Sequence, residues 1–184
     1  MRNAVIAGVM VLAMSAAPAL ARGKKQITQI SDQEFVIDAA KGHMAELELG
    51  KLAETRATSD QVRTFAKKMV DDHQKALDNL KTVAANEKIT LPTTLDPKDR
   101  ALKNRLEQLS GHAFDRAYVR DMIRDHRHDV AEFRTESKTA KAADVKQYAS
   151  STLPTLEDHL KLARSTDKSI VGTSAKSSGK KPVG

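Results

Sequence analysis

The chain has 184 residues, a formal net charge of +7 at neutral pH, and neither cysteine nor tryptophan. Without cysteine it forms no disulfide bond and offers a metal ion no thiolate ligand. The sequence contains no Gly-rich phosphate loop, no His-Glu-x-x-His zinc motif, no Gly-x-Ser-x-Gly nucleophile motif and no alternation of aromatic and basic residues that would stack nucleobases. These absences argue against a nucleophilic hydrolase and against a specific nucleic-acid partner.

Residues 1–21 have the pattern of a secretory signal peptide. Arg2 is the single charge, an apolar run covers residues 5–14, and Ala19-Leu20-Ala21 supplies the small residues of a cleavage site. The run is shorter than the ~20 apolar residues that an uncleaved anchor needs to span a bilayer. We therefore expect cleavage between Ala21 and Arg22, and export of the mature chain to the periplasm.

The positive charge is concentrated in two tails. Residues 22–30 form a basic N-terminal segment, and residues 166–184 hold four lysines and one aspartate, whereas residues 31–165 contain equal numbers of basic and acidic residues. The Ser/Gly/Lys-rich composition predicts that the 166–184 tail is disordered. Such tails can bind an anionic component of the cell envelope. A solubilising role is the simpler interpretation.

Two helices are predicted in the first half of the chain. Ser31-Asp32-Gln33-Glu34 is a capping box, so a helix should begin there and end near Ala57. Ser59 should cap a second helix that ends near Lys88. Because the joint between them is so short, the two helices should be antiparallel.

A long connection and two more long helices complete the chain. After an extended segment, Asp96-Pro97 provides an N-cap and a proline at the first position of a short helix. Long helices are predicted over residues 114–138 and 142–164, with a kink at Pro154 in the last. Residues 31–165 should therefore form one all-α domain, a four-helix bundle with a long crossover between helices two and three, which is the ferritin-like arrangement.

A five-residue motif occurs twice. Met69-Val70-Asp71-Asp72-His73 recurs as Met122-Ile123-Arg124-Asp125-His126. In both copies the histidine lies at the centre of a stripe of apolar residues spaced three and four apart, which is the pattern of a buried helix face. We expect His73 and His126 to point into the core, with the two methionines as apolar filling. The alternative is that the methionines are soft ligands for a cuprous ion.

The other two long helices also carry inward groups that can ligate a metal. The complete candidate set is His43, Glu46, His73, His126 and His159. Neutral imidazoles with a carboxylate suit a divalent transition metal such as zinc, copper, nickel or iron. Counting residues from the turns places His43 and His73 at one level of the bundle. The same count leaves His159 roughly 7–8 Å from the level of His126 at 1.5 Å per residue.

The same residues can instead form a structural polar layer, in which each imidazole pairs with a carboxylate or a carbonyl and fixes the helix register. Asp72 and Asp125, next to two of the histidines, would be such partners, or would orient histidines that ligate a metal. A catalytic histidine pair without metal is a third interpretation. His112 and His128 are predicted to lie on the surface.

These residues resemble the DUF4142 family, exported bacterial proteins of the ferritin-like superfamily that are often labelled as outer-membrane proteins. The resemblance covers residues 31–164 and depends on blocks at 35–40, 44–53, 62–73, 114–119 and 153–160. It implies a four-helix bundle and an exported location, and it brings no settled activity. Ferritin-like di-iron proteins use Glu-x-x-His motifs, whereas His43-Met44-Ala45-Glu46 has the reverse order, which argues against oxygen-activating di-iron chemistry.

The sequence thus favours an exported helical bundle that binds or sequesters a metal ion in the periplasm, where association with the outer membrane is an alternative to a free location. We assign no catalytic residue. The competing hypothesis is a non-catalytic envelope protein that acts through protein or surface contacts, and an oxidoreductase ranks behind both.

Overall fold

The computed structural model describes residues 30–177, in which every regular element is an α-helix. The predicted signal peptide, the basic segment up to residue 29 and the last seven residues lie outside the described part. The helices are α1 (Asp32–Arg56), α2 (Asp60–Asn86), α3 (Pro97–Glu107), α4 (Gly111–Thr139) and α5 (Ala143–Ser177).

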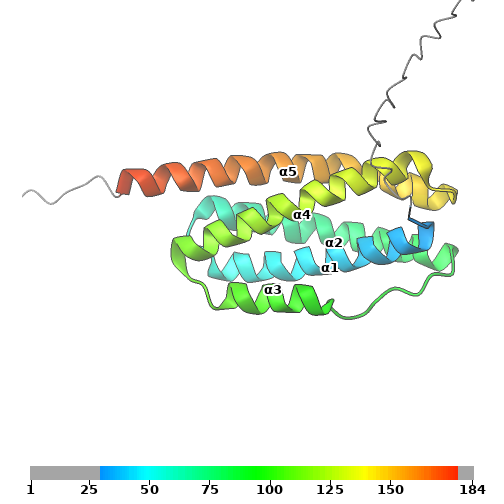
Figure 1. Ribbon diagram of the computed structural model, residues 1–184, viewed down its shortest axis with the longest axis horizontal. Helices are drawn as coiled ribbons and strands as arrows, with labels where there is room; N and C mark the ends of the chain where they lie inside the picture. The colour runs from blue at the N-terminus through cyan, green and yellow to red at the C-terminus, as the bar shows by residue number, and fades with distance from the viewer. Residues whose placement is uncertain (1–29, 178–184) are drawn as a thin grey trace, which may run out of the picture.

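Two antiparallel hairpins form the bundle (Figure 1). α1 packs mainly on α2, and α4 packs mainly on α5, while α2 also contacts α5 and α1 contacts α4. The crossover between the hairpins carries α3, which lies alongside α1 (Figure 1). The predicted all-α bundle with a long crossover between its second and third long helices is confirmed. Within the described residues no helix has an apolar stretch long enough to cross a bilayer.

Local capping starts two of the helices as predicted. The Ser31 hydroxyl accepts a hydrogen bond from the Glu34 amide at 3.2 Å, and the Glu34 carboxylate accepts one from the Ser31 amide at 2.8 Å. At α3, the Asp96 carboxylate accepts from the Lys98 amide at 3.1 Å, and Pro97 takes the first helical position. Each of these caps satisfies amides that the helix itself leaves without a partner.

The two hairpin turns are capped from a distance. The Asp115 carboxylate of α4 accepts hydrogen bonds from the Thr58 and Ser59 amides, both at 3.0 Å, at the turn between α1 and α2. The Asp32 carboxylate of α1 does the same at the turn between α4 and α5, where the Lys141 and Ala142 amides donate at 3.1 and 2.6 Å. Each hairpin therefore caps the turn of the other hairpin with a carboxylate. These contacts fix the position of one hairpin along the axis of the other.

The core consists of two apolar clusters. The first lies toward the start of α1 and is built mainly from Phe35, Val36, Ala40, Leu77, Leu80, Val130, Phe133, Val145, Tyr148 and Leu156. The second lies toward the turn between α1 and α2 and includes Leu49, Phe65, Met69, Leu106, Phe114, Tyr118, Met122, Ala163 and Ile170. Every long helix contributes to both clusters, and between its two contributions it places at least one buried polar side chain.

The C-terminal helix corrects one prediction. Disorder from residue 166 onward is wrong for residues 166–177, because α5 continues to Ser177. Ala163, Thr166 and Ile170 are buried, and Ile170 packs in the second apolar cluster. Their spacing of three and four residues continues the apolar stripe of α5, which the Ser/Gly/Lys-rich composition beyond it obscured. α5 also passes through Pro154 without ending.

Gly50 lets α1 approach α2 closely. A Cβ atom at this position would lie 2.9 Å from Val70 Cγ2 and 3.3 Å from the Ala66 carbonyl oxygen. Valine is stiff and the carbonyl belongs to the backbone, so neither can move aside without shifting a helix. This contact lies one turn from Glu46 on α1 and one turn from His73 on α2, and it therefore sets how close those two side chains come.

We expect Gly50→Ala to destabilise the protein and Gly42→Ala to stabilise it. Both changes favour the helix by about 0.5–1 kcal/mol, and no heavy atom of the described residues would lie within 4 Å of a Cβ at Gly42 apart from its own helix backbone and chain neighbours. At Gly50 the overlap should cost about 1–3 kcal/mol. Urea unfolding of the two variants measures the difference, and equal stability would contradict the close contact.

Candidate metal centre

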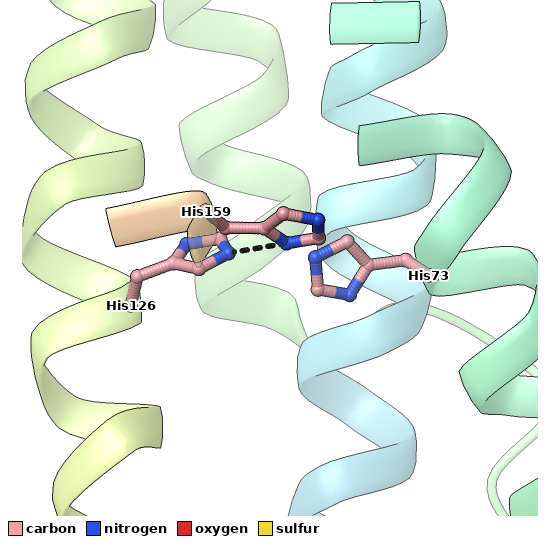
Figure 2. A group of neighbouring side chains, drawn as sticks. All are labelled: His73, His126 and His159. Carbon is pink, nitrogen blue, oxygen red and sulfur yellow. Dashed lines mark hydrogen bonds between the residues drawn. The ribbon is translucent and has the colours of Figure 1, made fainter. Parts of the chain in front are cut away.

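A polar layer separates the two apolar clusters. It consists of His43 and Glu46 from α1, His73 from α2, His126 from α4 and His159 from α5, all 0–3% exposed. We call these five residues the histidine layer. Figure 2 shows that His73, His126 and His159 converge from three helices. The structure therefore brings together all five residues that the sequence selected as metal ligands.

His159 lies in this layer although residue counting placed it at another level. Its ring Nδ1 is 3.2 Å from Nε2 of His126. From the observed helix ends, His126 is 13 residues before the end of α4 and His159 is 16 residues after the start of α5, a mismatch of only ~4.5 Å at 1.5 Å per residue. Side chains lean toward the N-terminus of their own helix, and in antiparallel helices these two lean toward each other.

The two predicted aspartates have different positions. Asp72 borders the layer, where its Oδ2 atom lies 2.9 Å from Nε2 of His159 and 2.7 Å from the Lys68 ammonium. Its partner is thus a histidine on another helix and not its chain neighbour. Asp125 does not reach the layer. It lies 3.3 Å from Arg124 and lines a surface cleft, because its face of α4 points toward α1 and α3.

Hydrogen bonding fixes the protons of two layer histidines. His126 Nδ1 is 3.0 Å from the Met122 carbonyl oxygen, which can only accept, so Nδ1 carries the hydrogen and Nε2 carries a lone pair. Burial acts to raise the pKa of Asp72, but hydrogen bonds from Lys68 and His159 outweigh burial and lower that pKa. The ionised Asp72 can only accept, so His159 donates from Nε2 and keeps its lone pair on Nδ1. Two lone pairs therefore face each other across 3.2 Å.

His43 and His73 form the other half of the layer. Their Nδ1 atoms are 2.9 Å apart, and Nε2 of His43 is 2.6 Å from the Tyr148 hydroxyl, which is also 3.3 Å from the Ala76 carbonyl oxygen. Whichever of the two Nδ1 atoms donates the proton, Nε2 of His73 has no hydrogen-bond partner within residues 30–177. Tyr148 was not among the predicted residues. Its position 11 residues before His159 puts both on one face of α5, and that spacing was the available signal.

Glu46 lies between the two histidine pairs. Its two carboxylate oxygens are 3.1 Å from Nδ1 of His73 and from Nδ1 of His126. Both nitrogens already face other partners, and neither Glu46 oxygen forms a hydrogen bond in the described part of the chain. Burial raises the pKa of Glu46 well above its usual range, with added repulsion from Asp129 and Asp125. A buried carboxyl without a hydrogen bond costs free energy that a bound cation would recover.

The histidines of the layer are neutral at neutral pH. Burial lowers the pKa of His43 and that of His126 to about 4. Burial also lowers the pKa of His73, where the neighbouring histidines add to the effect, and that of His159 despite its bond to Asp72. Neutral imidazole is the form that ligates metals, so no proton has to leave these rings before an ion binds.

Several overlapping groups in the layer have the spacing of metal ligands. His73, His126 and His159 each place one ring nitrogen within 4.8 Å of the other two, and so do the ligand atoms of His43, Glu46 and His73. Two ligands about 2.0–2.1 Å from a tetrahedral ion lie ~3.3 Å from each other. The 3.2 Å between His126 and His159 fits two ligands of one ion.

Comparison with known proteins identifies the family. Residues 16–166 match the family described as Domain of unknown function (DUF4142). The chain belongs to this family. No curated protein matches this DUF4142 chain.

Solved structures with the same helical fold include metal-bound proteins. CopM in the Cu(II)-bound form is 16% identical, with a TM-score of 0.65 over 77% of the DUF4142 chain and 98% of CopM. CopM in an Ag-bound form obtained by soaking is 18% identical, with a TM-score of 0.61 over 74% and 95%. A DUF305 fragment from Deinococcus radiodurans is 17% identical, with a TM-score of 0.64 over 76% and 94%.

The stability that the neutral histidines contribute to the metal-free protein should be lost as the pH falls from 6.5 to about 4. In this window the unfolded chain protonates histidines, with an ordinary pKa of 6.5, that the folded layer keeps neutral. His43 and His126 should each contribute about 3 kcal/mol to this loss. Glu46, Asp125 and Glu132 have the opposite sign, since burial raises their pKa values and so favours folding at low pH. The histidine contribution is therefore measured as the difference from a variant that lacks one buried histidine.

Urea unfolding with chelator present, at pH values from 7.5 to 4, measures this dependence. His126→Gln should reduce the loss of stability on acidification, whereas His112→Ala, which removes an exposed histidine of α4, should leave the dependence unchanged. A His126→Gln variant with the same pH dependence as the wild type would contradict a neutral histidine layer.

Proposed function

We propose that this protein binds a transition metal ion in the histidine layer and holds it in the periplasm. The observation that carries the proposal is the 3.2 Å distance between Nε2 of His126 and Nδ1 of His159, whose lone pairs face each other because the other nitrogen of each ring donates to Met122 or Asp72. Two such acceptors repel each other unless a cation lies between them. Nε2 of His73 and the carboxylate of Glu46 add two further buried groups without hydrogen-bond partners in the described residues.

A proton between His126 and His159 is the competing explanation, and it corresponds to a purely structural layer. Burial disfavours it, because the pKa of His126 is lowered to about 4 and that of His159 is also lowered. The bridging proton would therefore be absent at neutral pH. A metal ion supplies positive charge without depending on these pKa values, which is why the geometry favours a metal.

The donor set determines the class of ion. Three imidazoles with one carboxylate suit Cu(II), Zn(II), Ni(II) and Fe(II), and among divalent ions copper binds such sites most tightly. The shared fold with the Cu(II)-, Cu(I)- and Ag-bound forms of CopM supports copper as the first ion to test. The ligands are almost completely buried, which leaves little room for a substrate beside the ion and favours storage or sequestration over catalysis.

Protein purified without tag and without chelator should contain close to one transition metal ion per chain. Adding that ion to the metal-free protein should raise its melting temperature, since a ligand at 100 times its Kd stabilises the folded state by about 2.7 kcal/mol. His126→Gln should lose both the bound ion and the thermal shift. His112→Ala, the matched control at an exposed histidine of the same helix, should behave as the wild type.

A structural layer predicts another outcome. No ion would copurify, neither copper, zinc, nickel nor iron would shift the melt, and His126→Gln would still destabilise the protein by about 1–3 kcal/mol through loss of its hydrogen bonds. That combination would end the metal-binding proposal.

A periplasmic role requires export, and the apolar run before Ala19-Leu20-Ala21 supports it. We expect the mature protein to begin at Arg22 and to appear in the periplasmic extract. N-terminal sequencing of the protein from fractionated cells measures this, and a cytosolic chain that still begins with Met1 would contradict it.

A further inference from the structure

A cleft of about 520 Å³ lies between α1, α4 and the crossover that carries α3. Seven carboxyl groups and three cationic side chains line it. Burial raises the pKa of Glu46 well above its usual range, and the other six carboxyl groups still outnumber the cations, so the cleft has a net negative charge. We call it the acidic cleft. Glu46 reaches this cleft from the histidine layer: it is 3% exposed, it lines the cleft, and neither of its oxygens has a hydrogen-bond partner among the described residues.

Ligand groups form a continuous series from the layer into this cleft. The inner group, His73, His126 and His159, shares His126 with a second group, Glu46, His126 and Asp129. The second group shares Asp129 with a third, His128, Asp129 and Glu132. Within each group the ligand atoms lie within 4.8 Å of one another, and neighbouring groups share one residue and differ in the other two.

Exposure rises along this series. The side chains of Asp129 and Glu132 are 20% and 17% exposed, and that of His128 is 78% exposed. His128 is the outermost of the three because it is rotated by about 160° from His126 around α4 at 100° per residue, whereas Asp129 and Glu132 are rotated by about 60° and 120°. The side chains of α4 at these positions therefore lie one after another between the core and the solvent.

We propose that the acidic cleft is the route by which a transition metal cation reaches the histidine layer, with His128, Asp129 and Glu132 as the outer capture site. Asp129 then shares the ion with Glu46 and passes it inward to His126. This inference rests on the proposed function of the layer. It adds an outer cation site and assigns a role to the crossover, whose α3 segment forms one wall of the cleft.

The chemistry of the groups suits this passage. A cleft lined by one sign of charge raises the local concentration of its counter-ion and can raise association rates by ~10–10³. Oxygen ligands on the outside exchange readily with the water of a hydrated ion, and imidazoles inside bind transition metals more tightly. Each step therefore replaces some of the ligands of the ion and never requires a bare cation in the apolar core.

The test compares two double variants of the full chain with the wild type. His128→Ala/Glu132→Gln removes the outer site, and Glu87→Gln/His112→Ala makes the same change in charge and imidazole number at exposed positions away from the cleft. Stopped-flow quenching of tyrosine fluorescence by Cu(II) measures the association rate, since Tyr148 lies 2.6 Å from His43 in the layer. Equilibrium titration with a competing chelator measures the affinity.

We expect the cleft variant to take up Cu(II) at least 10-fold more slowly at low ionic strength, with an unchanged equilibrium affinity, because uptake and release slow together. The control variant should match the wild type, and added salt should narrow the difference by screening the cleft. An unchanged association rate would overturn the route and leave the layer as the binding site. A loss of affinity equal to the loss of rate would also overturn it, since those groups would then hold the bound ion. A wild-type chain that binds no Cu(II) would overturn the proposed function as well.

Discussion

The burial of four imidazoles and a carboxyl group between two apolar clusters is the constraint on which the rest of the structure depends. In the charged state these groups would lose several kcal/mol of hydration each, so the layer stays neutral and its pKa values shift accordingly. A neutral layer still needs partners for its lone pairs. Tyr148 pairs with His43, and Asp72 accepts the N–H of His159, whereas the lone pairs of His126 and His159 that face each other have no donor.

Such a layer works only if the helices meet in register, and the two distant caps provide that register. Asp32 lies 11 residues before His43 in α1, and Asp115 lies 11 residues before His126 in α4. Because each aspartate holds the turn of the other hairpin, each fixes the level of the histidine that follows three turns later. Beyond those histidines, Glu46 and Asp129 each follow at three residues, so α1 and α4 share one arrangement of cap, imidazole and carboxylate.

The same layer would link stability to a bound ion. Apolar side chains in these positions would stabilise the bundle more than buried polar groups without partners do, so the layer is costly in the metal-free protein. An ion bound only by the folded chain would offset that cost. Deep burial would also keep competing water and ligands away from such an ion, which would then need a path inward. The carboxylates of α4 and the crossover supply the negative charge along such a path.

The sequence by itself determined the helices, the capping box, the crossover and the five inward residues, because caps and a 3.6-residue period are local properties of a chain. The repeated five-residue motif also indicated that α2 and α4 are equivalent helices, and these two helices run in the same direction (Figure 1). Only the tertiary structure decided that Asp72 faces His159 while Asp125 faces the cleft. It also decided that Tyr148 and Asp129 lie next to the histidine layer, and that α5 extends to Ser177. Those outcomes depend on how each helix is rotated and shifted along its axis relative to its neighbours. Side-chain packing across the core determines both, and the sequence of a single helix does not encode them.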